Sequence, residues 1–433
     1  MTAEVAILNK LGIALAADSA VTISEGSDSR KVFNTADKLF ELSRSQAIAC
    51  MVFSNLQFMQ APLQVLIKEF RTACEACETV AEASKALLKY LQEFAAKASD
   101  QVKVAAVQAN VRVIYDVLAG RVGQRIESKF SDPNFLVGVE DPRALVEATV
   151  RDVWSDSIDL LTAYAETWPA VEIVGDFPDG ATLEPIFRAV FEESERPPPE
   201  NQVERVIAFL TEALKKGSPF ESSTGMVIAG YGSKELFPTL EHFDLYTPVL
   251  GALKFRTVER VDIGTSGPRA RVMAFAQREM AERFLFGLDT QIKSKILRFC
   301  NEAIPSIGDY AASLVEFEDQ PKADAFRAEV RKAETAFVGG LEKAGLETIR
   351  EESQSAVEDM VEFMPKQDLA EFAEALVNLS SLQRRVNSGF ETVGGPIDVA
   401  VISKSEGLVW VKRKHYFTAD LNARFLNRIG AGA

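Results

Sequence analysis

The chain has 433 residues, 47% of them apolar and 26% charged, which is a globular composition with enough apolar material for more than one core. Its net charge of −15 argues against a general binder of nucleic acid or of anionic membranes. No apolar stretch reaches the roughly 18 residues of a membrane span, and the first residues carry no basic leader, so we expect a cytoplasmic protein.

The first part of the chain predicts strands followed by helices. Residues 4–23 alternate between apolar and small or polar residues, which predicts two short strands joined at residues 9–12. A helix is expected from Pro62, because proline is tolerated in a first turn and apolar residues follow at helical spacing. The other elements predicted in this part are strands over 37–43 and 46–53 and a helix over 79–94.

Two helix-rich blocks interrupt the rest of the chain. Residues 99–222 are helical and acidic with a Pro-rich breaker at 195–200, and a second charged, helical block covers about 290–365. The elements expected outside these blocks are strands over 225–232, 251–264 and 270–275, a helix over 368–386, a hairpin over 394–413 and a short terminal helix. The order of elements predicts an α+β layered fold.

Cysteine and histidine are scarce, and this limits the chemistry. Cys74 and Cys77 form a CxxC within the helix expected from Pro62, where packing is favoured over metal or redox use. His242 is predicted in a polar loop and His415 at the end of a basic strand, which disfavours Ser-His-Asp and Cys-His mechanisms. We expect no metal and no cofactor.

The start of the chain resembles proteasome β-subunits and their bacterial HslV-type relatives. Thr2 directly follows the initiator Met, AADS occupies residues 16–19, and KLFEL occupies residues 38–42. The resemblance continues in three blocks that cover about half the chain and resemble the family's helices and closing strands. The organisation that follows is an N-terminal-nucleophile (Ntn) hydrolase core over 1–98, 223–289 and 366–433, with helical insertions over 99–222 and 290–365.

The resemblance implies a four-layer αββα sandwich and threonine-dependent hydrolysis of peptide or amide bonds. Peptide or protein substrates, a homo-oligomer and an ATP-dependent unfoldase are the partners that it implies, with neither nucleic acid nor membrane among them. Two alternatives stay open on the same fold. One is a catalytically inactive structural or binding subunit, and the other is a small-molecule amidase or acylase.

An N-terminal threonine has a physical advantage as a nucleophile. Its α-amine, with a pKa of about 7.7–8.0, can take the hydroxyl proton near neutral pH, whereas an internal threonine has only an amide nitrogen. Thr2 therefore qualifies once Met1 is removed. By resemblance, Lys38 would favour the ionised hydroxyl oxygen and Asp18 would hold that lysine, with Lys31 as the competing lysine.

The supporting residues depart from the family pattern. Phe53-Ser54-Asn55 stands where the family has two glycines, which makes Ser54 a candidate for the oxyanion position. Phe275-Ala276-Gln277 replaces a Gly-Ser-Gly segment, and Glu391 falls near the family's last supporting residues. Ser54, Gln277 and Glu391 are therefore the candidates for oxyanion binding and support of the catalytic residues.

Overall fold

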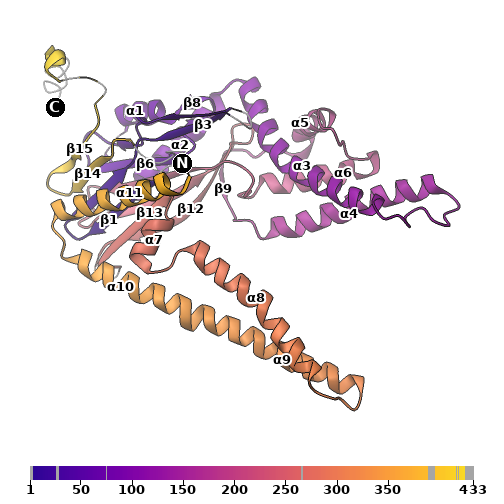
Figure 1. Cartoon of the computed structure of the whole chain (residues 1–433). Helices are drawn as coiled ribbons and strands as arrows, with labels where there is room; N and C mark the ends of the chain where they lie inside the picture. Colours follow the sequence, from indigo (N-terminus) through magenta and orange to yellow (C-terminus); the bar gives the residue numbers. More distant parts are fainter. Residues whose placement is uncertain are drawn as a thin grey trace. The chain divides into compact units, whose positions relative to one another are not determined.

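The computed structural model describes residues 3–25, 29–74, 76–264, 267–388, 395–415, 417 and 419–424. The chain forms two compact units. Unit 1 comprises Met1–Leu39 and Asp262–Ala433, and unit 2 comprises Phe40–Val261. Each unit combines an antiparallel sheet with helices, so the fold is mixed α/β (Figure 1).

Unit 1 is built on a five-stranded sheet in the order β13-β1-β2-β14-β15. Its strands are β1 (Ala3–Asn9), β2 (Gly12–Ala17), β13 (Ala270–Ala276), β14 (Asp398–Ser403) and β15 (Gly407–Lys412). Alternate apolar residues of β1 and β2 pack with α7 (Glu279–Phe286) and α11 (Lys366–Ser388) in one core. A separate hairpin joins β3 (Val21–Glu25) and β4 (Ser29–Phe33).

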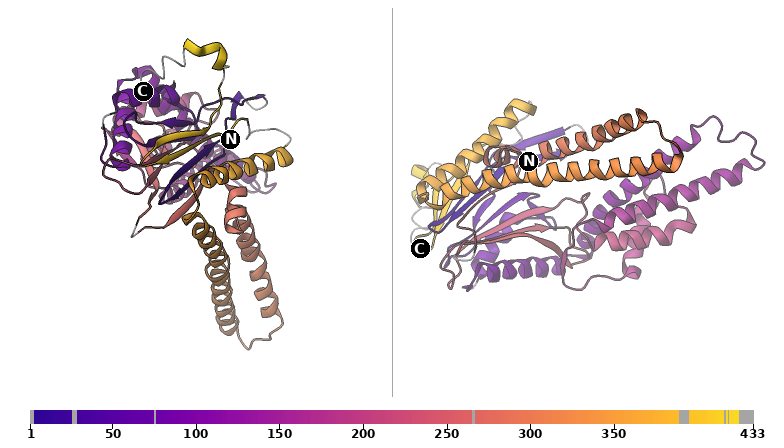
Figure 2. Two further views of the ribbon diagram at one scale, coloured as in Figure 1. Left: turned by 90° about the vertical axis from the view of Figure 1, so that its left-hand side faces the viewer. Right: turned by 90° about the horizontal axis from the view of Figure 1, so that it is seen from below.

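A helical arm also belongs to unit 1. Its helix α8 (Thr290–Ser313) runs beside α9 (Gln320–Gly340), and the two extend together away from the sheet of this unit (Figure 2). After α9, the chain continues through the π-helix η1 (Leu341–Glu347) into α10 (Thr348–Glu362), which packs on β13. A short 3₁₀ helix, η2 (Ala419–Asn422), lies near the end of the described chain.

Unit 2 contains a six-stranded sheet in the order β5-β6-β10-β11-β12-β9. Its strands are β5 (Leu39–Glu41), β6 (Ile48–Ser54), β9 (Glu172–Val174), β10 (Thr224–Gly230), β11 (Thr239–Leu245) and β12 (Leu253–Asp262). Helices α1 (Leu63–Ala73) and α2 (Val80–Lys97) cover one face, because their apolar stripes share a core with alternate strand residues. The short strands β7 (Gln57–Phe58) and β8 (Ala61–Pro62) precede α1.

Unit 2 also holds a helical bundle with a core of its own. Its helices are α3 (Asp100–Phe130), α4 (Pro142–Glu166), α5 (Gly180–Glu192) and α6 (Glu200–Leu214). Tyr115 and Phe187 lie at its fully buried centre, and the Phe191 ring packs at a tilt against the Tyr115 ring, with 4.9 Å between the centroids. No helix in the described part of the chain is both long and apolar enough to cross a bilayer.

Most predicted elements are confirmed, among them the hairpin that turns at residues 9–12 and the helix from Pro62. Two predictions are wrong, and one hairpin was missed. His242 lies in β11 rather than in a loop, since alternation of buried and half-buried residues continues through this polar stretch. The CxxC is not helical: α1 ends at Ala73, and Cys74 and Cys77 lie beyond it against the core. The β3–β4 hairpin was not expected.

Candidate functional site

The β1–β2 turn sets the register at the start of the chain. The Asn9 side-chain oxygen accepts hydrogen bonds from the backbone N–H groups of Leu11 (2.9 Å) and Gly12 (3.2 Å), which stabilises the tight turn. A Cβ at Gly12 would lie 2.7 Å from the Ile402 carbonyl oxygen, so only glycine fits there without a shift. The register that results places Ala17 opposite Glu4 and brings Asp18 to Ala3.

Asp18 and Lys38 form a fully buried ion pair in unit 1. The Lys38 Nζ lies 2.7 Å from Asp18 Oδ1 and donates to the Ala20 carbonyl oxygen at 2.6 Å. Asp18 Oδ1 also accepts the backbone N–H of Ala3 at 3.1 Å, and the Asp18 N–H donates to the Ala3 carbonyl oxygen at 3.1 Å. The first residues of β1 are thus bonded directly to this pair. Buried charges are costly unless paired and hydrogen-bonded, and both conditions are met here.

Glu4 adds a third buried ionisable group on the same strand. Its side chain is 1% exposed, and neither carboxyl oxygen has a hydrogen-bond partner among the described residues. Burial raises the pKa of the Glu4 carboxyl well above its ordinary value; the charge of Lys38 opposes this rise and that of Asp18 adds to it. A protonated Glu4 is a hydrogen-bond donor within electrostatic reach of the Asp18–Lys38 pair.

The backbone is left-handed at two residues within the segments that depart from the family pattern. Ser54, at the end of β6, has φ of 69°, and Ala276, at the end of β13, has φ of 60°. Residues other than glycine adopt this region at a cost of about 1–2 kcal/mol, and such strain clusters at functional sites. At both positions the backbone has the shape that glycine favours, although neither residue is glycine.

The structure brings together some of the predicted site residues. Asp18 and Lys38 meet, and Gln277 directly follows Ala276, the register partner of Ala3, so it lies beside the start of β1. Ser54 belongs to unit 2 and is exposed. Thr2 and Glu391 lie outside the described residues, and so does the side chain of Lys31, which belongs to β4.

A second ionic cluster involves Asp37, the residue that precedes Lys38. Lys414 Nζ forms an ion pair with the buried Asp398 and lies 3.5 Å from Asp37 Oδ1, while the Lys414 N–H donates to Asp398 Oδ1 at 2.8 Å. Asp398 pairs in register with Ala17, which is also the partner of Glu4. Glu4 and Asp398 therefore lie on the same face of the sheet, one on each side of Ala17.

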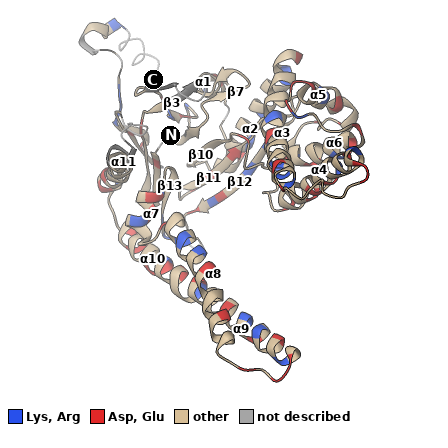
Figure 3. Ribbon diagram, turned by 45° about the vertical axis from the view of Figure 1, so that its right-hand side comes forward, with Lys and Arg blue, Asp and Glu red and all other residues tan. Residues whose placement is uncertain are grey.

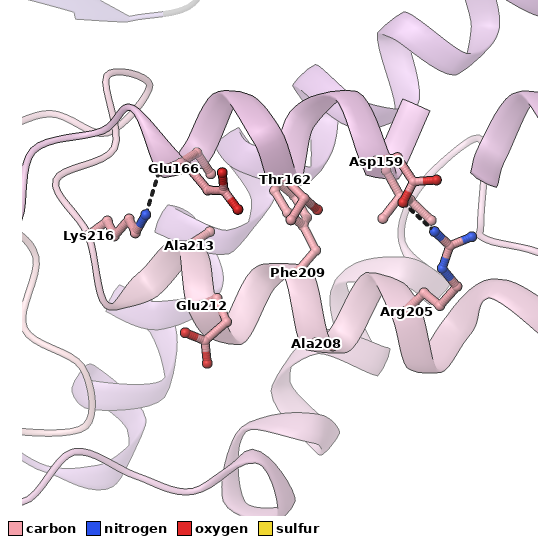
Figure 4. Close-up of a pocket in the computed structure, with 11 residues that line it drawn as sticks. Asp159, Thr162, Glu166, Arg205, Ala208, Phe209, Glu212, Ala213 and Lys216 are labelled. Carbon is pink, nitrogen blue, oxygen red and sulfur yellow. Dashed lines mark hydrogen bonds and ion pairs between the residues drawn. The ribbon is translucent and has the colours of Figure 1, made fainter. Parts of the chain in front are cut away.

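Two cavities lie within unit 2. One cavity, of about 450 Å³, lies between α4 and α6 and has Phe209 in its wall. The Arg205–Asp159 ion pair lies at one end, and at the other end Lys216 donates to the Ala165 carbonyl oxygen (Figure 4). The other, of about 280 Å³, is lined by the 55–60 loop, α3 and the end of β11 without any ionisable acid or base other than Tyr246.

Sequence reasoning missed Glu4 and the strain at Ala276. The signal for Glu4 was present, because one acidic residue stands in a strand that is otherwise apolar on both faces. The residue types around Ala276 do not predict its left-handed backbone conformation. Among the described residues, no group of three or more His, Cys, Asp and Glu side chains could hold a metal ion.

Comparison with known proteins identifies no family. No family model matches the chain, and no curated protein matches it. Among solved structures, the chain is similar to an Anbu mutant from Hyphomicrobium sp. strain MC1, with 9% sequence identity and a TM-score of 0.26, over 100% of this chain and 96% of that chain. At this TM-score and identity, the likeness identifies neither a shared fold nor a shared function.

Proposed function

We propose that the protein is a threonine-type amide hydrolase whose nucleophile is Thr2, exposed as the N-terminal residue when Met1 is removed. The observation that supports this most is the buried Asp18–Lys38 pair, which is hydrogen-bonded to the backbone of Ala3 at the start of β1. Buried, specifically paired ionisable groups cluster at functional sites. The proposal includes the four-layer αββα sandwich expected from the sequence.

The proposed mechanism moves one proton from the Thr2 hydroxyl to the α-amine and then to the leaving nitrogen. The α-amine of Thr2 takes the hydroxyl proton, the hydroxyl oxygen attacks the substrate carbonyl carbon, and the amine then delivers the proton to the departing nitrogen as the C–N bond breaks. Water hydrolyses the resulting ester and regenerates the hydroxyl. The positive charge of Lys38 favours the ionised form of the Thr2 hydroxyl oxygen, and Asp18 fixes the position of Lys38.

Intact-mass measurement before and after treatment with an N-terminal-threonine-directed epoxyketone tests the proposal. We expect a mass that lacks Met1 and a single adduct, which Thr2→Ala abolishes. The matched control is Thr35→Ala, which removes an exposed threonine of the same unit and should label like the wild type. A mass equal to the full translated chain with no adduct would overturn the proposal and favour a structural subunit. Turnover of small amides but not of peptides would favour the amidase alternative.

A further inference from the structure

In the helical arm of unit 1, α8 turns small residues toward α9 and large apolar residues toward solvent. Helix α8 approaches α9 through small residues: Gly308 and Ala312 are its buried positions. A Cβ at Gly308 would lie 2.7 Å from Val330 Cγ1 of α9, so the two helices are in close contact there. Large apolar residues normally fill such an interface, because their burial is what stabilises a helix pair.

The large residues of α8 face outward instead. Phe299, Ile307, Tyr310 and Leu314 are between 66% and 70% exposed. Their spacing places the three in α8 on one side of the helix, with Leu314 continuing that side at the helix end. We call these four residues the α8 stripe. Contiguous apolar patches on a protein surface mark interaction sites, whereas scattered apolar residues do not.

We propose that the α8 stripe is a self-association surface, on which the α8 of a second copy of this chain packs antiparallel to the first. Two arms paired in this way place the two α8 helices against each other, with each α9 on the far side of its own α8. Such a pairing buries the large side chains that a single two-helix arm leaves in water. The pairing is isologous, so both copies use the same residues and the assembly closes on itself.

The distribution of charge identifies a second copy as the occupant. The first turns of α8 carry the exposed Lys295 and Arg298, and the turn that follows α8 carries the exposed Glu316 and Glu318. Arg298 also pairs with Glu302 in α8 and Glu318 with Lys322 in α9, whereas Lys295 and Glu316 have no ion pair among the described residues. Figure 3 shows basic and acidic residues along this arm. An antiparallel partner therefore brings its acidic end to the basic end of the first copy, at both ends of the interface. A parallel arrangement would bring like charges together, and such contacts are unfavourable.

Sedimentation equilibrium with a stripe variant is the first experiment. We expect the wild type to associate at micromolar concentrations and Ile307→Asp to raise the dissociation constant roughly 30-fold or more, as for a central interface residue. Leu236→Asp is the matched control, because Leu236 is 71% exposed but lies in unit 2, and it should associate like the wild type. A monomeric wild type, or equal effects of the two variants, would overturn the proposal.

Charge reversal tests the antiparallel orientation. One variant combines Lys295→Glu with Arg298→Glu, and the other combines Glu316→Lys with Glu318→Lys. Each alone should associate at least about tenfold more weakly, because like charges then meet at both ends. Their equimolar mixture should regain association as a heterodimer, which a folding defect could not produce. A mixture that associates no better than its components would overturn the orientation. These readouts do not depend on Thr2 or on catalysis.

Discussion

Among the described residues, each unit contains one fully buried lysine–carboxylate pair, and the two pairs differ in what surrounds them. In unit 1, Asp18 and Lys38 are 2.7 Å apart and are bonded to backbone groups at the start of β1. In unit 2, Glu221 and Lys254 are also 2.7 Å apart. Their distances and burial are the same, so the ion pair alone does not indicate a role.

The second pair connects the helical bundle to the sheet within unit 2. Glu221 accepts from the side chain of Asn110 in α3 at 2.6 Å, and Lys254 of β12 donates to the Lys216 carbonyl oxygen, just beyond α6, at 3.0 Å. Burial raises the pKa of Glu221 and lowers that of Lys254, while each group's charge opposes the shift of the other. The groups bonded to this pair come from α3, from the segment after α6 and from β12. Its surroundings indicate a structural role.

Removing the lysine of each pair should separate the two roles. We expect Lys38→Met to slow epoxyketone labelling of Thr2 by roughly 100-fold or more, the loss seen when a preorganised electrostatic group is removed from a catalytic site. Lys254→Met should leave the labelling rate per folded molecule unchanged. Each variant strands a buried carboxylate, so each should lose about 3–5 kcal/mol of unfolding free energy. Mass spectrometry follows the labelling, and urea titration follows the stability.

This comparison has two outcomes that would contradict it. If both variants lose labelling in proportion to their loss of stability, the Asp18–Lys38 pair is structural like its counterpart. If Lys38→Met labels at the wild-type rate, the lysine has no part in activating the hydroxyl.

Glu4 provides a pH-dependent test, because its buried carboxyl lies within electrostatic reach of the Asp18–Lys38 pair. The native state keeps a proton on Glu4 above the ordinary value of 4.5, at which the unfolded chain releases it. The native state then binds more protons than the unfolded state, so the unfolding free energy falls as pH rises from 4.5 toward the raised pKa. Below 4.5 both states are protonated and the effect disappears.

Glu4→Gln should remove this dependence while keeping the size of the side chain. We expect the unfolding free energy of the variant to exceed that of the wild type by an amount that grows as pH rises from 4.5 toward the raised pKa of Glu4. Glu352→Gln, at an exposed position of the same unit, should show no such growth. Urea titrations across this pH range measure the difference. A constant offset would mean that Glu4 is ionised in both states.

The sequence predicted the strands near the site because their periodicity is local. Alternation in residues 4–23 and the turn at Asn9 are enough to define the β1–β2 hairpin, and its register carries Asp18 to Ala3. The contact with Lys38 is not local, because the lysine comes from beyond a separate hairpin that the sequence did not predict. Resemblance therefore selected Lys38 over Lys31, and no pattern in the residues did so.

The main error in the predicted fold concerned strands that are rich in polar residues. His242 lies in β11, between β10 and β12, yet its neighbours Glu241 and Asp244 made this stretch read as a loop. Arg260 pairs with Glu241 at 3.2 Å and Arg256 with Asp244 at 2.6 Å. Since partners on a neighbouring strand compensate these charges, a single-sequence pattern gives no sign of a strand there.

The smallest predicted effect concerns the strained residues that end β6 and β13. Ala276 has φ of 60°, and glycine would hold the same conformation without the clash of Cβ with the backbone. Ala276→Gly should raise the unfolding free energy by about 0.5–1 kcal/mol, the strain relieved less the entropy that glycine costs. Ala274→Gly is the matched control: it lies in the same strand with no left-handed backbone, and it should lower stability by about 0.5–1 kcal/mol.

The labelling rate of Ala276→Gly gives a second readout, because Ala276 pairs with Ala3 at the start of β1. If the variant is more stable but labels more slowly at Thr2, the alanine methyl helps to position the start of β1 in addition to the backbone shape. Unchanged labelling would mean that the left-handed backbone alone is what the site requires at this position.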